Sequence, residues 1–230
     1  MSFFPIFIRL SGKRCLVIGG GSVGTRKVEA LRDGGADVAV VSERVSPELL
    51  EQIERGEVTY LGERFSPELL NGVFLCISAV DDRQSNDLIA AECKRRGILV
   101  NVVDLPESCD FFTPSVVRRG DLVVAASSGG AAPSATKRVR REIEGRFGDE
   151  YRIFVKIIGK IRAELKKSGV SGDGLSRIMN KIADLPLPEM IASGRMGDIP
   201  ALVSETLKDE KETMAVDIDS LVRSSFGGGS

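Results

Sequence analysis

Residues 15–27 read Cys-Leu-Val-Ile-Gly-Gly-Gly-Ser-Val-Gly-Thr-Arg-Lys, and this stretch decides the fold of the chain. The apolar run at residues 16–18 leads directly into a glycine-rich turn. The residues after the turn are apolar at roughly helical spacing. This order predicts a strand, a tight turn and a helix.

The turn contains a Gly-x-Gly-x-x-Gly pattern made by Gly19, Gly21 and Gly24. In a nucleotide-binding turn the first glycine permits the turn and the second lets the backbone approach a pyrophosphate. The third lets the helix lie against the strand. The start of the helix then offers N–H groups and a partial positive charge to the phosphates. The pattern alone is common in α/β proteins, so its meaning depends on the residues further along the chain.

A second apolar run, at residues 38–41, ends at Ser42, Glu43 and Arg44. Glu43 lies nineteen residues past Gly24, where a ribose-binding acid is expected. Its carboxylate favours NAD, although Arg44 could receive the additional phosphate of NADP. We predict NAD as the cofactor. The predicted cofactor-binding residues are Gly19, Gly21, Ser22, Val23, Gly24, Ser42, Glu43, Arg44, Ser78, Ala79 and Asn101.

Continuous apolar runs at residues 73–78 and 98–103 alternate with a helical pattern at 85–96. This alternation predicts a Rossmann-type, doubly wound parallel sheet of the α/β class. Ligands bind beyond the carboxyl ends of strands in such sheets, and Asp104 follows the last predicted strand. Asp104 is therefore either a catalytic carboxylate or a turn-forming residue.

The pattern changes after Pro106, where two β-type runs flank Arg119 and Gly120 and predict an antiparallel hairpin. Hydroxyls and glycines then precede a basic helix and predict a second anion-binding site at the start of that helix. That helix has either a solvated basic face or a wall that binds carboxylates. The candidate substrate-binding residues are Ser128, Arg118, Arg119, Lys137, Arg138 and Arg141.

The remainder predicts a small helical domain, with an apolar stripe from Ile153 to Leu165 on its first helix. We therefore expect four segments. These are a Rossmann domain at residues 1–110, a dimerisation and substrate-wall segment at 111–150, a helical domain at 151–223 and a disordered tail at 224–230.

Composition narrows the possible functions. The 230 residues carry a net charge of −1, so no overall field draws the chain to nucleic acid or an anionic membrane. No apolar stretch approaches the ~20 residues of a membrane span, and the first residues lack the charged region of a signal peptide. We therefore expect a cytoplasmic protein.

Histidine is absent, which excludes imidazole metal ligands and imidazole acid–base catalysis. The four cysteines are spaced 61, 17 and 16 residues apart, which fits no zinc motif. We predict that they are reduced and structural, and that the chain holds no metal of its own.

Several motifs in one order resemble the precorrin-2 dehydrogenase family of sirohaem synthesis. They are the glycine turn, Asn101-Val-Val-Asp104, Cys109-Asp-Phe-Phe-Thr-Pro114, and Ser127-Ser-Gly-Gly-Ala-Ala-Pro133 before a basic helix. Some members of this family are also sirohydrochlorin ferrochelatases, and the same unit forms the N-terminal half of sirohaem synthases. The likeness is close over residues 3–150 and loose beyond them.

The resemblance implies NAD-dependent oxidation of precorrin-2 to sirohydrochlorin by a homodimer. It places the proposed catalytic aspartate at Asp104 and a serine near the tetrapyrrole at Ser128. Precorrin-2 carries several carboxylates, which suits the group of cations around the basic helix. Insertion of Fe²⁺ is left open, as is an alternative in which the chain is an NAD(H)-sensing module without tetrapyrrole chemistry.

Overall fold

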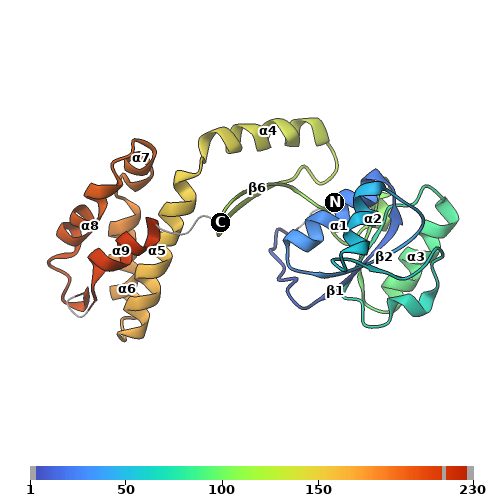
Figure 1. Ribbon diagram of the computed structural model, residues 1–230, viewed down its shortest axis with the longest axis horizontal. Helices are drawn as coiled ribbons and strands as arrows, with labels where there is room; N and C mark the ends of the chain where they lie inside the picture. Colours follow the sequence, from blue (N-terminus) through green and yellow to red (C-terminus); the bar gives the residue numbers. More distant parts are fainter. Residues whose placement is uncertain (1–3, 214–215, 227–230) are drawn as a thin grey trace. The chain divides into compact units, whose positions relative to one another are not determined.

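The computed structural model describes residues 4–213 and 216–226. The chain forms two compact units (Figure 1). The first contains residues 4–113 together with 129–131, and the second contains residues 114–128 and those from 132 onward. The hairpin and basic helix therefore belong with the C-terminal helices rather than with the sheet.

The first unit is built on a five-stranded parallel sheet of order β3-β2-β1-β4-β5. Leu16 in the central strand pairs with Ala39 on one side and Cys76 on the other. The Rossmann-type prediction is confirmed. The elements are β1 (Arg14–Gly20), α1 (Ser22–Asp33), β2 (Asp37–Val45), α2 (Pro47–Glu54), β3 (Thr59–Tyr60), η1 (Pro67–Leu70), β4 (Leu75–Ser78), α3 (Arg83–Arg95), β5 (Leu99–Val102) and η2 (Pro106–Ser108).

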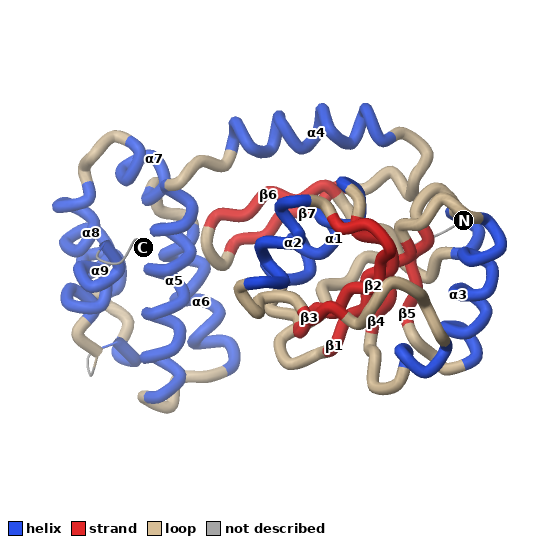
Figure 2. The backbone as a smooth tube through the Cα atoms, turned by 45° about the vertical axis from the view of Figure 1, so that its right-hand side comes forward, coloured by secondary structure: helices blue, strands red, loops and turns tan. Residues whose placement is uncertain are grey.

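Both faces of the sheet are buried, because successive side chains of each strand point to opposite sides. Cys15 and Val17 of β1 belong to the apolar cluster that includes residues of α1 and α2. Leu16 and Ile18 belong to the cluster that includes residues of α3. Figure 2 shows α1 and α2 on one face of the sheet and α3 on the other. Two-sided burial explains why the sequence of β1 is a continuous apolar run.

Strand β2 is longer than the sequence predicts, since it continues past Ser42 to Val45. The register of β1 and β2 shifts between the Ile18 and Gly20 pairs, and Gly20 pairs with Val45. The Ser42 hydroxyl accepts a hydrogen bond from the Gly20 N–H at 2.8 Å and donates one to the Arg44 carbonyl at 2.6 Å. Ser42 therefore ties this irregular strand end to the glycine turn.

The second unit begins with the predicted antiparallel hairpin, in which Val117 pairs with Val124. The basic helix α4 packs on both strands of the hairpin. Helix α9 continues through Phe226, so residues 224–226 are helical, and the rest of the predicted tail, 227–230, lies outside the described residues. The elements are β6 (Ser115–Arg119), β7 (Leu122–Ala126), α4 (Pro133–Arg146), α5 (Glu150–Lys167), α6 (Gly172–Ala183), α7 (Leu187–Ala192), η3 (Met196–Asp198), α8 (Ile199–Leu207), η4 (Lys211–Thr213) and α9 (Ile218–Phe226).

The C-terminal helices share one apolar core. Ile157, Ile161 and Leu165 of α5 are fully buried in it, which confirms the predicted stripe. Across the described part of the chain, no helix is long and apolar enough to cross a membrane.

One charged group is buried at the edge of this core. The Glu210 carboxylate lies 2.8 Å from the Arg177 guanidinium and 2.7 Å from the Lys181 ammonium. Hydrogen bonds from Arg177 and then from Lys181 lower the pKa of Glu210 to about 2. A carboxylate whose pKa is lower in the folded than in the unfolded state stabilises the folded state at pH values above the unfolded pKa. This contribution is lost as the pH falls through the folded pKa.

We expect Glu210→Gln to lower the melting temperature of the full chain at neutral pH, because Arg177 and Lys181 then lose a buried anion. The difference from wild type should shrink as pH falls from about 4.5, the usual value for a glutamate, toward 2. Thermal unfolding followed by circular dichroism between pH 2 and 7 measures this difference. Glu205→Gln, which removes an exposed partner of Lys208, is the matched control and should have little effect. A difference for Glu210→Gln that is independent of pH would contradict the assignment.

Candidate active site

The glycine turn leaves no room for side chains at two of its three positions. Gly19 has φ of 107°, and a Cβ on it would lie 2.3 Å from the Ala79 carbonyl oxygen at the end of β4. A Cβ on Gly24 would lie 1.8 Å from the Gly19 carbonyl oxygen. These two glycines let β1, α1 and β4 converge. The roles predicted for Gly19 and Gly24 thus agree with the geometry.

Gly21 differs, because a Cβ there would meet no atom within 4 Å. It is the N-cap of α1 and is exposed, as is Ser22 after it. The start of α1 is therefore open to an external group. An open glycine before an uncapped helix N-terminus fits a phosphate-bearing cofactor.

The predicted ribose-binding residues lie on the outer part of β2. Glu43 and Arg44 are both exposed, and Glu43 lies 3.9 Å from Arg64 in a loose ion pair. The Ser42 hydroxyl is already engaged with Gly20 and Arg44, so we reassign Ser42 from cofactor contact to support of the turn. Glu43 and Arg44 can both reach a ligand from solvent.

Asp104 stands at the carboxyl edge of the sheet, as predicted. Its φ of 65° makes it the one residue other than glycine with positive φ in the described ranges 4–213 and 216–226. An aspartate in this region costs of order 1 kcal/mol or more, and such strain clusters at functional sites. Asp104 is exposed and lines a pocket of about 160 Å³ together with Val80, Asp81, Arg83 and Asn86, among others.

Ser78 and Asn101, two predicted cofactor residues, face the interior instead. Ser78 is fully buried, and its hydroxyl donates to the Asn86 side-chain oxygen at 2.7 Å. Asn101 is 6% exposed, and its amide donates to the Phe111 carbonyl at 2.9 Å. Both side chains hold loops at the pocket, and neither is free to contact a cofactor. Ala79, in the loop between β4 and α3, remains partly exposed.

The candidate residues for substrate binding belong to the second unit. The half-buried Ser128 accepts hydrogen bonds from the Ala132 N–H and the Thr136 hydroxyl, both at 3.0 Å. It therefore anchors the start of α4. The Thr136 hydroxyl also lies 3.1 Å from the Ala132 carbonyl oxygen, so Ser128, Thr136 and Ala132 form one hydrogen-bonded group at the start of the helix.

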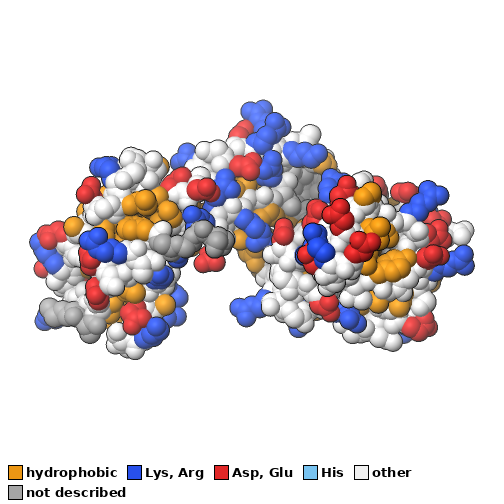
Figure 3. All heavy atoms as spheres, viewed as in Figure 1, with side chains coloured by type: hydrophobic (Ala, Val, Ile, Leu, Met, Phe, Trp, Pro, Cys, Tyr) orange, Lys and Arg blue, Asp and Glu red, His pale blue; other side chains and the backbone are white. Residues whose placement is uncertain are grey.

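The cations near α4 divide into two groups. Arg119 is engaged within the unit, since its guanidinium donates to the carbonyls of Arg118 and Glu144 at 2.9 and 3.3 Å. Its predicted role as a substrate contact is replaced by a structural one. The others are exposed, and Figure 3 shows Lys and Arg side chains gathered along α4. These exposed residues are Arg118, Lys137, Arg138 and Arg141. Arg138 is exposed although it is paired with Glu142 at 2.9 Å.

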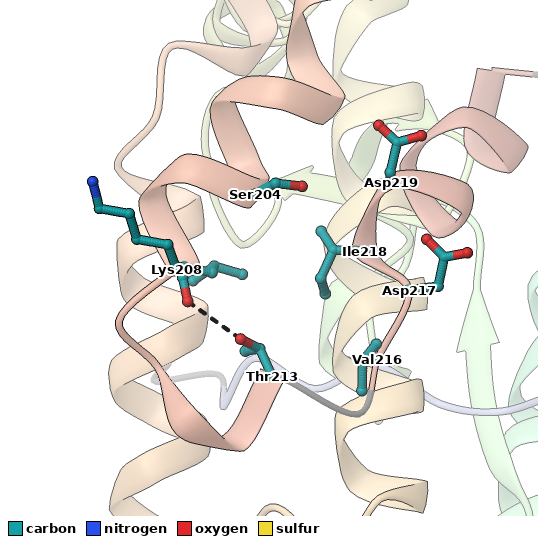
Figure 4. Close-up of a pocket in the computed structure, with 8 residues that line it drawn as sticks. Ser204, Lys208, Thr213, Val216, Asp217, Ile218 and Asp219 are labelled. Atoms are coloured by element: carbon teal, nitrogen blue, oxygen red, sulfur yellow. Dashed lines mark hydrogen bonds between the residues drawn. The ribbon is translucent and has the colours of Figure 1, made fainter.

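A larger pocket of about 330 Å³ lies in the helical core, against α8, η4 and α9 (Figure 4). None of the predicted site residues lines it. Its wall carries Asp217, Asp219 and one cation, Lys208, so it lacks the group of cations that would bind a polycarboxylate. No group of three or more potential metal ligands occurs among the residues that the structure describes.

Sequence reasoning missed two features of the first unit. Lys27 of α1 is partly buried and donates to the Thr113 hydroxyl at 3.0 Å, and burial, followed by the charge of Arg26, lowers its pKa. Arg83 lines the Asp104 pocket and lies 3.5 Å from Glu107. Neither has a sequence signal of its own, because each depends on a loop that returns from a distant part of the chain.

Known proteins resemble this chain over the first unit and much of the second. Residues 6–115 match a family model described as putative NAD(P)-binding. Siroheme synthase from Chromobacterium violaceum is 36% identical over 194 residues, which is 84% of this chain and 41% of that protein. Siroheme synthase from Nitrosospira multiformis is 37% identical over 216 residues, 92% of this chain and 46% of that protein. The chain thus spans less than half the length of these relatives.

The fold is also that of a solved structure, SirC, a precorrin-2 dehydrogenase. The two superpose with a TM-score of 0.69 over 88% of this chain and all of the other, at 24% sequence identity. The likeness includes the helical unit as well as the sheet, because it extends well beyond the first 113 residues.

The glycine turn generates a paired prediction. We expect Gly24→Ala to destabilise the protein by about 1–3 kcal/mol, because its methyl group would overlap the Gly19 carbonyl. Gly21→Ala should fold nearly as well as wild type but bind NAD at least about tenfold more weakly, because its methyl group would occupy the space open to the cofactor. Denaturant unfolding and calorimetric titration with NAD⁺ separate the two effects. Unchanged NAD affinity in Gly21→Ala would remove Gly21 from the cofactor site.

Proposed function

We propose that the chain belongs to the precorrin-2 dehydrogenase family and oxidises precorrin-2 to sirohydrochlorin with NAD⁺. The observation that carries this proposal is the placement of Asp104. An exposed carboxylate in a strained conformation stands at the same sheet edge as a glycine turn that is open to a phosphate-bearing ligand. A base beside a nicotinamide site is the arrangement that a dehydrogenase needs.

The reaction removes one hydride and one proton from the macrocycle and extends its conjugation. NAD⁺, when bound, accepts the hydride. Asp104 accepts the proton, and a positioned base of this kind contributes about 10²–10⁴ to the rate. Gly21 and Ser22 bind the pyrophosphate, and Glu43 favours the unphosphorylated ribose of NAD over NADP, whose phosphate it would repel. Gly19, Val23, Gly24, Arg44 and Ala79 complete the proposed cofactor site.

The substrate is a polycarboxylate, and the exposed cations of the second unit suit it. Arg118, Lys137, Arg138 and Arg141 supply charge-assisted hydrogen bonds, and Ser128 stands just before the same helix. A chain with net charge −1 needs such a local group to attract an anion. This assignment is separate from that of Asp104 and has its own test.

We further propose that the chain acts as a homodimer through the hairpin and α4. Helix α4 has no buried residue in the single chain, and its Val139 is 43% exposed. A second copy would cover these surfaces.

Fe²⁺ is a candidate second substrate, for which Asp104 would accept the pyrrole protons. We infer dehydrogenation as the main activity, because the sequence has no histidine to receive the metal.

The deciding assay supplies precorrin-2 anaerobically, without metal, together with NAD⁺ or NADP⁺. Equal amounts of sirohydrochlorin and reduced cofactor should form, and faster with NAD⁺. Addition of Fe²⁺ afterwards tests chelation. Binding of NAD⁺ without any reaction or tetrapyrrole binding would instead support an NAD(H)-sensing module.

We expect Asp104→Asn to lower kcat by about 10²–10⁴-fold, because the amide cannot accept the proton. NAD⁺ affinity should stay within about twofold of wild type, since Asp104 does not belong to the glycine turn. Steady-state kinetics and NAD⁺ titration measure the two quantities. Asp81→Asn, at the same pocket, is the matched control and should retain most activity. Full activity of Asp104→Asn would exclude Asp104 as the base.

We expect Arg138→Glu to raise the Michaelis constant for precorrin-2 by about tenfold, because it replaces an attraction with a repulsion at an exposed site. The Michaelis constant for NAD⁺ should not change. Arg162→Glu makes the same charge change at an exposed position of α5 and serves as control. Equal effects of the two substitutions would indicate general charge repulsion rather than a binding contact.

A further inference from the structure

The segment that follows the Asp104 turn folds back along β5. The Asp110 carboxylate accepts a hydrogen bond from the Val100 N–H at 3.0 Å, and the Asp110 N–H donates to the Val100 carbonyl at 2.8 Å. Asn101 binds the Phe111 carbonyl from the same strand. This segment, residues 109–113, is therefore fastened to β5 at successive positions. We call it the strap.

The first residue of the strap contacts both ends of the turn that contains Asp104. The Cys109 thiol accepts from the Val102 N–H at 3.2 Å and lies 3.2 Å from the Val102 carbonyl oxygen. It also lies 3.4 Å from the Leu105 carbonyl oxygen and accepts from the Asn101 amide at 3.4 Å. Val102 precedes the turn and Leu105 follows it. One side chain thus closes the loop across the strained residue.

We propose that a clip formed by Asn101 and Cys109 positions the Asp104 carboxylate. Neither residue needs to touch substrate or cofactor, because Asn101 is buried and the half-buried Cys109 thiol is hydrogen-bonded to the turn and to β5. Both are positioning residues that act through the backbone of residues 102–105. This inference rests on the proposed function, in which Asp104 is the base.

The chemistry of the clip suits a fixed structural role. Burial raises the pKa of the Cys109 thiol, so the group stays protonated at neutral pH and can both donate and accept. Asn101 is oriented by its bond to Phe111, so its amide reaches the sulfur in a set direction. A left-handed aspartate persists only where its surroundings over-determine it, and the clip provides that constraint.

Substitutions of Cys109 can remove its hydrogen bonds to different degrees. Serine keeps one donor and one acceptor at this place, whereas alanine removes both. A displacement of about 1 Å in a catalytic group can cost about 10²-fold in rate. We therefore expect Cys109→Ala to lower kcat by about 10–100-fold, with the Michaelis constant for NAD⁺ within about twofold, and Cys109→Ser to recover most of the loss.

The test combines these variants with Asp104→Asn in a double-mutant cycle, using single-turnover rates of precorrin-2 oxidation by the full chain. If the clip acts through Asp104, Cys109→Ala should cause no further loss once Asp104 is replaced. Ser108→Ala, next to the strap, is the matched control. Amide hydrogen exchange of residues 103–105 is measured on the same proteins, and it should be faster in Cys109→Ala than in Cys109→Ser or wild type.

An equal loss from Cys109→Ala in both backgrounds would overturn the proposal, and so would an unchanged kcat in the presence of faster exchange. Unchanged exchange in Cys109→Ala would show that the thiol does not hold the turn. If Cys109→Ala does not fold, the Cys109→Ser variant decides. The proposal is overturned if Cys109→Ser has the kcat of wild type although amide hydrogen exchange of its residues 103–105 differs from wild type. Absence of oxidation by wild type would refute the proposed function instead, while the exchange data still report whether the clip holds the turn.

Discussion

The architecture of the first unit depends on one steric constraint, the approach of α1 to the end of β1. A Cβ at Gly24 would lie 1.8 Å from the Gly19 carbonyl oxygen, and one at Gly19 would lie 2.3 Å from the Ala79 carbonyl oxygen. The helix therefore leaves the sheet at the point where β1 and β4 separate. Because the strand order reverses there, the same constraint that packs the fold also shapes the sheet edge where we propose the ligand site.

The fold could be predicted from the sequence because its signals are local. Buried strands appear as continuous apolar runs, and a glycine follows the end of each of two helices, Gly34 after α1 and Gly97 shortly after α3. The antiparallel hairpin and the apolar stripe of α5 are likewise visible in short windows. Strand β2 is longer than predicted, because its extension to Val45 depends on a pairing with Gly20 that no local pattern records.

The candidate site is less predictable, because residue type does not reveal where a side chain points. Ser78 and Asn101 are polar residues at strand ends, where ligand contacts are expected. The side chains of both are instead hydrogen-bonded to other groups of the fold. The sequence predicts Arg119 among the substrate-binding cations, but it donates to two backbone carbonyls. The positions of the glycines and Asp104 are predictable because they follow from backbone geometry and strand order, while their roles stay predictions.

These internal contacts explain how a site built on loops can be rigid. Asp104 is exposed, and its own side chain has no role in packing, so its position must be set by the backbone on either side. That backbone is held by groups from β5 and the strap, which the chain reaches only after it has passed Asp104. The polar residues that surround the pocket therefore divide into those that face a ligand and those that hold the loops. Burial, rather than chemistry, separates the two groups: Asn101 is buried and holds the strap, whereas Asp104, three residues on, is exposed at the pocket.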